Sequence, residues 1–242
     1  MDELGNWRQH ADRSTNPSNP MVNISVDPVN AYSAWPADMN LDGTVQTTET
    51  VSLNYDDARG FLNKQPDANG LGWRYWHDGF GRLSKVERCL NAACTGSPSW
   101  TVEYRYTADG RLATRDKSND SEAAVWLLYD GGQVIAEQTT TERNTWYVWS
   151  GSTLLQSARV LTAEQGVDKL HLHQDRIGNV VLATRLNGAS VQLWGRVQFD
   201  PYGRRVSGVG WEDHGVVVPY RFAGQRLDAD TGQRHASQTV RS

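Results

Sequence analysis

The sequence predicts an all-β protein of repeated antiparallel hairpins that share one sheet, and three observations support this prediction. Several segments alternate apolar and polar residues with a period of two, which is typical of strands with one buried face. Asp and Gly recur together at intervals of about 20–30 residues, as they do in tight turns between strands. The chain has 10 Trp, 9 Tyr and 22 Gly, which favour strands and turns, and few helix-forming stretches.

The strand pattern differs between segments of the chain. Residues 101–106 and 170–173 alternate strictly between apolar and polar side chains. Residues 125–129 and 146–149 are apolar almost without interruption, which predicts strands that are buried on both faces. Residues 152–165 are also compatible with a short helix, although no capping residue marks its ends.

The turns repeat a short pattern: an Asp, two further residues, a Gly, one residue, and then an aliphatic or aromatic residue. One copy has Thr in place of Asp, one can be followed only as far as its Gly, and some copies are shortened. The pattern's first residue and its glycine stand at Asp2 and Gly5, Asp57 and Gly60, Asp78 and Gly81, Thr107 and Gly110, Asp130 and Gly132 (shortened), Asp175 and Gly178, and Asp200 and Gly203.

This pattern has a physical reason. An Asp at the first position of a type I turn accepts hydrogen bonds from the backbone N–H groups that follow it. A Gly three residues later can take the positive φ that returns the chain to a strand. Each repeat is therefore expected to be a hairpin with a linker. Because one hairpin cannot bury its face alone, successive hairpins are expected to share a long sheet.

Composition and charge exclude several classes of function. The chain of 242 residues has a formal charge of −4 and no clustered basic patch, which argues against general nucleic-acid binding. No apolar run reaches the roughly 18–20 residues of a membrane span, and mean hydropathy is −0.62. The N-terminus has neither a basic nor an apolar signal region, so we expect no signal peptide in this chain.

Residues 38–49 match a calcium-binding loop pattern at every specified position. The oxygen ligands would be Asp38, Asn40, Asp42, the carbonyl of Thr44, and Glu49. Pro36 precedes the loop, and no convincing entering helix is expected there. A diverged repeat turn over residues 40–45 is therefore the alternative to a calcium site. We expect no other cofactor.

The two cysteines, Cys89 and Cys94, lie close together in a loop rich in small and polar residues. Two ligands cannot make a structural zinc site alone. A hairpin disulfide is expected if the protein is exported, and two free thiols if it is not. His171 and His173 share one strand face, but no third metal ligand is evident.

The repeats resemble the Tyr-Asp (YD) repeats of rearrangement hotspot (RHS) proteins, of the C component of insecticidal toxin complexes, and of teneurins. The last third of the chain strengthens this resemblance. An Asp-Pro-x-Gly turn at residues 200–203 is followed by the strand-like segment Pro219–Gln225 and by a second turn at residues 228–232. The similarity covers roughly residues 1–7 and 50–232. Because the family's core continues beyond this point, we expect a fragment of a longer shell or a truncated reading frame.

The resemblance implies a spiralling β-sheet that forms part of a shell wall around a C-terminal toxin. It divides the chain into a diverged N-terminal region (1–49), a YD-repeat sheet (50–218) and the start of the RHS-associated core (219–242). The expected partners are the remainder of the shell and its toxin cargo. The parent protein is expected to be secreted or exposed at the bacterial cell surface.

RHS cores can cleave themselves by an aspartyl-protease-like reaction, which needs two carboxylates that share a proton. The acidic residues at matching positions are Asp200, Asp228 and Asp230. The family's later Asp-Pro segment and cleavage junction find no counterpart here. We therefore expect that Asp200 organises its turn and that this chain is not an enzyme.

A structural, encapsulating role is the predicted function, and two alternatives remain open. One is a carbohydrate- or cell-surface-binding module, because the tryptophans could stack on sugars. The other is a residual self-cleaving core. We expect most of the tryptophans to pack within the wall and not to stack on sugars.

Overall fold

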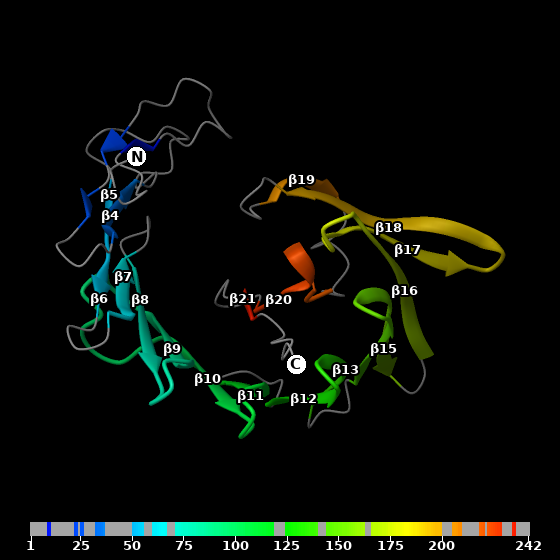
Figure 1. Cartoon of the computed structure of the whole chain (residues 1–242), viewed down its shortest axis with the longest axis horizontal. Coiled ribbons are helices and arrows are strands. Elements are labelled where there is room, and N and C mark those ends of the chain that lie inside the picture. Colours follow the sequence, from blue (N-terminus) through cyan, green and yellow to red (C-terminus); the bar gives the residue numbers. More distant parts are fainter. Residues whose placement is uncertain are drawn as a thin grey trace. The chain divides into compact units, whose positions relative to one another are not determined.

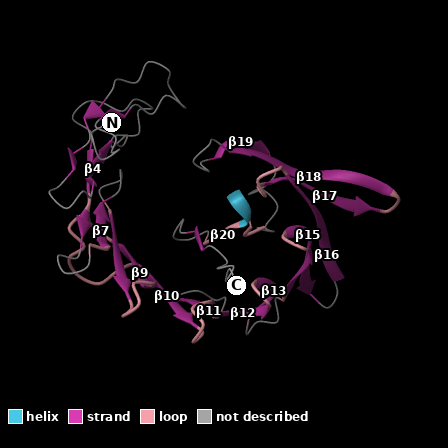
Figure 2. Ribbon diagram, viewed as in Figure 1, coloured by secondary structure: helices cyan, strands magenta, loops and turns pink. Residues whose placement is uncertain are grey.

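A computed structural model describes the following parts of the chain: residues 9–10, 22–23, 25–26, 32–36, 50–55, 60–66, 71–118, 124–139, 144–162, 166–199, 205–209, 218–220, 222–228 and 234–235. Within these residues strands are the predominant secondary structure, and they are joined by turns and loops (Figure 2). The prediction of an all-β, antiparallel hairpin protein is confirmed.

The main sheet has fourteen strands, and each pairs with its neighbours in the chain in the order β6 to β19. The strands are β6 (Asn54–Tyr55), β7 (Leu62–Pro66), β8 (Gly72–His77), β9 (Leu83–Cys89), β10 (Trp100–Tyr106), β11 (Leu112–Lys117), β12 (Val125–Asp130), β13 (Gln133–Gln138), β14 (Thr145–Ser150), β15 (Thr153–Thr162), β16 (Gly166–Gln174), β17 (Val180–Asn187), β18 (Ser190–Phe199) and β19 (Arg205–Val209). This order is that of consecutive hairpins.

Short elements flank the main sheet (Figure 1). Before it come β1 (Gln9–His10), β2 (Val22–Asn23), β3 (Ser25–Val26), β4 (Tyr32–Pro36) and β5 (Thr50–Ser52); after it come the 3₁₀ turn η1 (Phe222–Gly224), β20 (Arg226–Leu227) and β21 (Arg234–His235). Strand β1 pairs with β2, β4 pairs with β3 and β5, and β20 pairs with β21. No described helix is long and apolar enough to cross a membrane.

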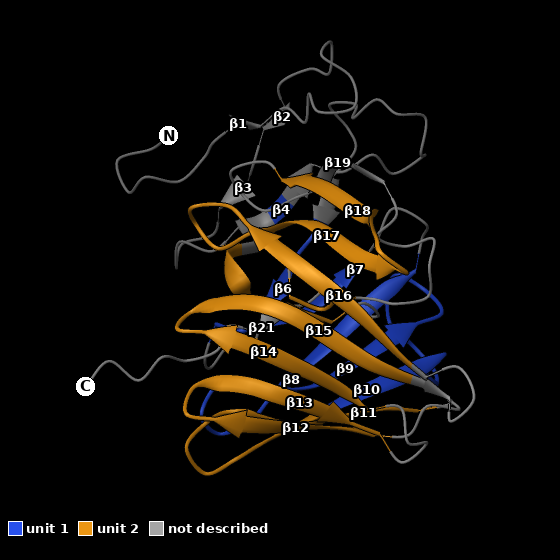
Figure 3. Cartoon of the chain, turned by 90° about the vertical axis from the view of Figure 1, so that its right-hand side faces the viewer, with its two compact units in different colours: residues 1–103 blue, residues 104–242 orange. Residues whose placement is uncertain are grey.

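The chain divides into two compact units, residues 1–103 and 104–242 (Figure 3). The boundary falls inside β10, whereas the sequence resemblance places boundaries after residues 49 and 218. Residues 218–220 and 222–228 belong to the second unit, as do the strand residues that they contact.

Alternating side chains build the core of the second unit. Residues that point to one face of β12–β17, here called the inner face, are buried: Leu127, Val134, Tyr147, Leu154, Leu170, Leu172, Val180 and Ala183. In the first unit, Tyr75, Val86 and Val102 form a similar buried row across β8, β9 and β10. Burying alternate side chains of a strand is the main source of stability in such sheets.

Two sequence expectations about β12–β15 are wrong. Residues 125–129 and 146–149 are buried on one face only, and their other face exposes Trp126 and Trp146. Residues 153–162 form strand β15, not a helix, because this segment pairs along its length with β14 and β16. Long-range strand pairing outweighs the weak local preference for a helix.

The repeat turns are held by their first side chain. Asp78 Oδ1 accepts hydrogen bonds from the N–H groups of Phe80 and Arg82, both at 2.9 Å. Asp175 Oδ1 accepts from Ile177 and Asn179 in the same way, at 3.0 and 2.9 Å. Thr107 Oγ1 accepts from the Arg111 N–H, with Asp109 as a second partner of its hydroxyl.

The glycine at the fourth position of these turns has positive φ. The values are +70° for Gly60, +78° for Gly81, +88° for Gly110 and +86° for Gly178. In the shortened turn after β12, which contains Asp130 and Gly132, the positive φ belongs to Gly131, at +55°. A two-residue hairpin turn puts this conformation on the first residue of the loop, directly after Asp130.

Gly81 gives a sharp test of the turn geometry. A Cβ at this position would lie 2.6 Å from the ring of Phe61, and the backbone already has positive φ. We expect Gly81→Ala to lower the free energy of unfolding by about 1–3 kcal/mol, measured by chemical denaturation. The control is Gly79→Ala in the same turn, where a Cβ meets nothing within 4 Å. Equal effects of the two substitutions would contradict this account of the turn.

Candidate functional site: a polypeptide segment held on the inner face

The candidate site is formed where residues 218–220 and 222–228, here called the docked segment, lie against the second unit's sheet (Figure 1). The segment folds back on itself. The Leu227 N–H donates to the Pro219 carbonyl at 2.7 Å, and Tyr220 and Arg226 form an isolated antiparallel bridge. The 3₁₀ turn η1 lies between the two arms, with Gly224 at φ +67°.

Asp228 anchors one end of the docked segment. Its carboxylate is fully buried and accepts hydrogen bonds from Arg115 Nε at 2.7 Å and from the Tyr104 hydroxyl at 2.8 Å. Burial alone would raise the pKa of Asp228. The hydrogen bond and charge of Arg115, helped by Tyr104, outweigh that effect and lower it. Asp228 therefore stays ionised at neutral pH.

Arg226 makes a second ion pair, in which the docked segment supplies the cation and the sheet supplies the anion. Its Nε and Nη2 donate to the two oxygens of Glu137 at 2.9 and 3.0 Å, which is a bidentate pair. The Tyr147 hydroxyl donates to the same carboxylate at 3.1 Å. Burial acts to raise the pKa of Glu137, but Arg226 lowers it overall. The sheet thus offers a cation to Asp228 and an anion to Arg226.

Aromatic and backbone contacts complete the docking. The ring of Tyr220 packs edge-on against Tyr147 and Trp149, with centroids 5.1 and 5.5 Å apart. The Ala223 N–H donates to Asn179 Oδ1 at 2.7 Å. Asn179 is itself held by Asp175 of the repeat turn, at 2.7 Å between side chains. A repeat turn therefore positions one of the groups that hold the docked segment.

The geometry of Asp228 suits anchoring. A shared-proton dyad needs a second carboxylate and a raised pKa, whereas Asp228 contacts a guanidinium and a phenol and has a lowered pKa. The other acidic candidates, Asp200 and Asp230, lie outside the described residues, as do Asp2, Gly5, Asp57, Gly203 and the whole loop 38–49. Within the described ranges no group of three or more acidic, His or Cys residues could hold a metal ion.

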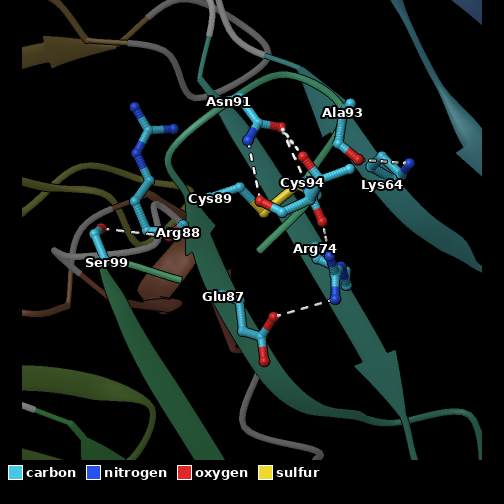
Figure 4. Close-up of a disulfide and its surroundings, with 10 residues drawn as sticks. Lys64, Arg74, Glu87, Arg88, Cys89, Asn91, Ala93, Cys94 and Ser99 are labelled. Atoms are coloured by element: carbon cyan, nitrogen blue, oxygen red, sulfur yellow. Dashed lines mark hydrogen bonds and ion pairs between the residues drawn. A yellow bond between two sulfur atoms is a disulfide. The ribbon is translucent and has the colours of Figure 1, made fainter. Parts of the chain in front are cut away.

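The first unit holds a disulfide between Cys89 and Cys94 (Figure 4). Both cysteines are buried. Arg74 donates to the Cys94 carbonyl, and Lys64 Nζ donates to the Ala93 carbonyl at 3.0 Å. The cysteine loop is thereby tied to β7 and β8.

His171 and His173 lie on β16. The Nε2 of His173 is 3.1 Å from the Thr184 hydroxyl on the neighbouring strand. A hydrogen bond between neighbouring strands accounts for this histidine without a metal.

Several residues of the docking site cannot be recognised from the sequence alone. They are Arg115, Glu137 and Tyr147, of which two are charged residues within strands. A charge at an inward position of a strand predicts a buried partner, because an unpaired charge there is costly. The partner's identity depends on contacts across about 90–110 positions of the sequence, which no local pattern encodes.

No protein-family model matches the chain, and no curated protein is similar to it in sequence. Among solved structures, it is similar to a chain of a Photorhabdus luminescens Tc holotoxin pore with mutated TccC3. That match has 15% identity, a TM-score of 0.50, and covers 98% of this chain and 14% of the other. A crystal structure of TcdB2-TccC3-TEV is similar at 14% identity and TM-score 0.49, covering 90% and 13%.

At this identity the holotoxin match shows the fold alone. The chain has the RHS-like antiparallel sheet that the sequence resemblance predicts. It spans about 14% of the length of the holotoxin chain that it matches.

Proposed function

We propose that the chain is a segment of an RHS-type β wall whose inner face holds polypeptide, in a protein that encloses a C-terminal toxin. The docked segment carries this proposal. It has little regular structure of its own, yet its charged groups are paired with partners on the strands. A wall that binds extended polypeptide needs such inward-facing charges and aromatic rings.

The role is structural, without catalysis by this chain. The buried carboxylates Asp228 and Glu137 each contact an arginine, and both have lowered pKa values. Such groups orient a chain but are poor proton donors near neutral pH. The residual self-cleaving alternative would depend on Asp200 and Asp230.

An extracytoplasmic location for the parent protein is part of the proposal. The buried Cys89–Cys94 disulfide supports it, because such bonds form and persist in oxidising compartments.

The calcium-type loop at residues 38–49 lies outside the described residues. We also propose that this loop binds a calcium ion.

For the alternative function, carbohydrate binding, the described part of the chain offers two exposed tryptophans as candidate contacts. Most of the described tryptophans make packing contacts; Trp149, for example, donates to the Val134 carbonyl at 2.8 Å and touches Tyr220. Among the tryptophan side chains that the structure describes, Trp126 and Trp146 are the most exposed, at 40% and 42%, and a sugar could stack on them.

Proteolysis tests the proposed function. The same short peptide, containing trypsin sites, is added after Ser242 in one variant and before Met1 in another. We expect trypsin to remove the C-terminal peptide at least about tenfold more slowly, because the wall shields polypeptide that continues from the docked segment. Equal rates would contradict enclosure by this chain.

An internal comparison separates docking from enclosure. Arg226 is buried in the docked segment, whereas Arg176 lies exposed in a turn. Mass spectrometry of the same digest should show cleavage after Arg176 well before cleavage after Arg226. Equal cleavage at both sites would show that the segment is not held on the inner face at all.

A further inference from the structure

The outer face of β12–β15 carries an apolar patch, defined by Trp126, Leu128, Ile135, Trp146, Val148 and Leu155. Their side chains are 39–47% exposed. Figure 3 shows these strands side by side at the front of the second unit. The register also places the uncharged Ala136, Gln138, Gln156 and Ala158 on this face. The only formal charge it places among these residues is Asp130, at the end of β12.

The patch is built from two equivalent hairpins. Trp126 and Leu128 on β12 occupy the places that Trp146 and Val148 occupy on β14, and both hairpins have a register shift before their turn. Small residues lie on both sides of Trp146, because its register partners are Ala136 on β13 and Ala158 on β15. The indole therefore stands above its neighbours, with room beside it for side chains of a facing sheet.

The size of the patch fits an interface between proteins. Six such side chains, each about two-fifths exposed, present an apolar area on the order of 500 Å², near the upper limit for a monomer surface. Interfaces are about 60% apolar, so two such patches correspond to a total buried area of about 1,600 Å². That is the standard size of a specific protein–protein interface.

We propose that this patch binds the same patch of a second copy of the chain, as two sheets stacked face to face about a two-fold axis. An uncharged patch fits an equally uncharged surface, and its own copy supplies one. With the axis parallel to the strands, hairpin β12–β13 of one copy lies over β14–β15 of the other. Sheets stacked in this way interdigitate their side chains about 10 Å apart.

Charges at the margins agree with this arrangement. Asp130 is exposed at the end of β12, and Lys169 is exposed on β16, next to Ala158 in the register. The same two-fold axis brings the Asp130 margin of one copy toward the Lys169 margin of the other. The two opposite charges at opposite sides of one patch thus become complementary when the patch meets itself. The docked segment takes no part, so the inference is independent of the proposed function.

Sedimentation velocity of the full chain over a concentration series tests the proposal. We expect a species of twice the 27.0 kDa chain mass that dissociates on dilution. Trp146→Lys should raise the dissociation constant at least about thirtyfold, because it places a charge at the centre of the interface. Ile177→Lys is the control, since Ile177 is 65% exposed in a turn outside the patch. Circular dichroism and thermal unfolding should be unchanged in both variants.

Charge reversal gives a second, more specific test. Asp130→Lys and Lys169→Asp should each weaken the dimer, and the double variant should restore it. A monomeric wild type at about 100 µM, or a dimer that Trp146→Lys leaves intact, would overturn the proposal. So would failure of the double variant to recover, which indicates a different geometry. Saturable binding of an oligosaccharide to a monomer through Trp126 and Trp146 would identify a glycan as the occupant instead.

Discussion

Replacing Asp228 with Asn will lower the free energy of unfolding by about 3 kcal/mol at pH 7, measured by urea denaturation. The substitution removes the carboxylate that pairs with Arg115 at 2.7 Å, so that a nearly buried guanidinium loses this counter-charge. Losing one member of a buried pair costs about 3–5 kcal/mol, because the remaining charge keeps its desolvation penalty. We expect the lower end of that range, since the Arg115 side chain is 12% exposed.

The pH dependence of this effect has a definite sign. The folded-state pKa of Asp228 lies below the ordinary value of 3.8, so the unfolded chain binds the proton more tightly. The stabilisation is therefore complete above about pH 5 and is lost as pH falls through the folded-state pKa. The difference between wild type and Asp228→Asn should shrink below pH 4. Glu137, whose pKa is also lowered, adds to the wild type's loss of stability in acid.

A surface ion pair is the control for Asp228. Asp109 lies 2.8 Å from Arg111, but its side chain is 52% exposed. Asp109→Asn should leave the free energy of unfolding nearly unchanged, because exposed pairs contribute little. Two results together would contradict this account: Asp228→Asn leaves the free energy of unfolding unchanged, as Asp109→Asn does, and trypsin cleaves after Arg226 no faster in the variant. The docked segment would then not depend on its buried charges.

Local chemistry explains why much of the fold could be predicted from the sequence. Asp78 and Asp175 organise their turns through side-chain acceptors two and four residues before their donors, and a sequence pattern displays such contacts directly. Alternation within strands is equally local. Once hairpins follow one another with short links, the order of strands in the sheet follows the order in the chain.

The functional surfaces depend on information that is not local. Nothing near Asp228 in the sequence indicates that Arg115 faces it, because 113 positions separate the two residues. Continuous apolar runs, such as 125–129, indicate burial on both faces when read alone. The structure leaves Trp126 and Leu128 exposed because the docked segment covers only the opposite face of that sheet. The sequence pattern therefore predicts the strands but not which of their faces are covered.

Breaking the Cys89–Cys94 disulfide is the second change with a large expected effect. The bond closes a short loop, with a sequence separation of 5. In the chain-entropy account, a loop of that length stabilises the folded state by about 2 kcal/mol. The disulfide also packs on β8: a Cβ added to Gly72 would lie 2.8 Å from Cys94 Sγ and 2.9 Å from the Asn91 carbonyl. The glycine leaves the space that the sulfur atoms occupy.

The double variant Cys89→Ala, Cys94→Ala should therefore lose about 2 kcal/mol of unfolding free energy relative to the oxidised wild type. Dithiothreitol should lower the stability of the wild type by a similar amount and leave the double variant unchanged, which makes each protein a control for the other. Hydrogen exchange locates the effect: the N–H groups of Cys94 and Thr95, which donate to Asn91 at 3.0 and 3.1 Å, should lose protection first. Equal stability of the oxidised and reduced wild type would contradict this prediction. It would show that Arg74, Lys64 and Asn91 hold the cysteine loop without the disulfide. The disulfide would then no longer support an oxidising compartment for the parent protein.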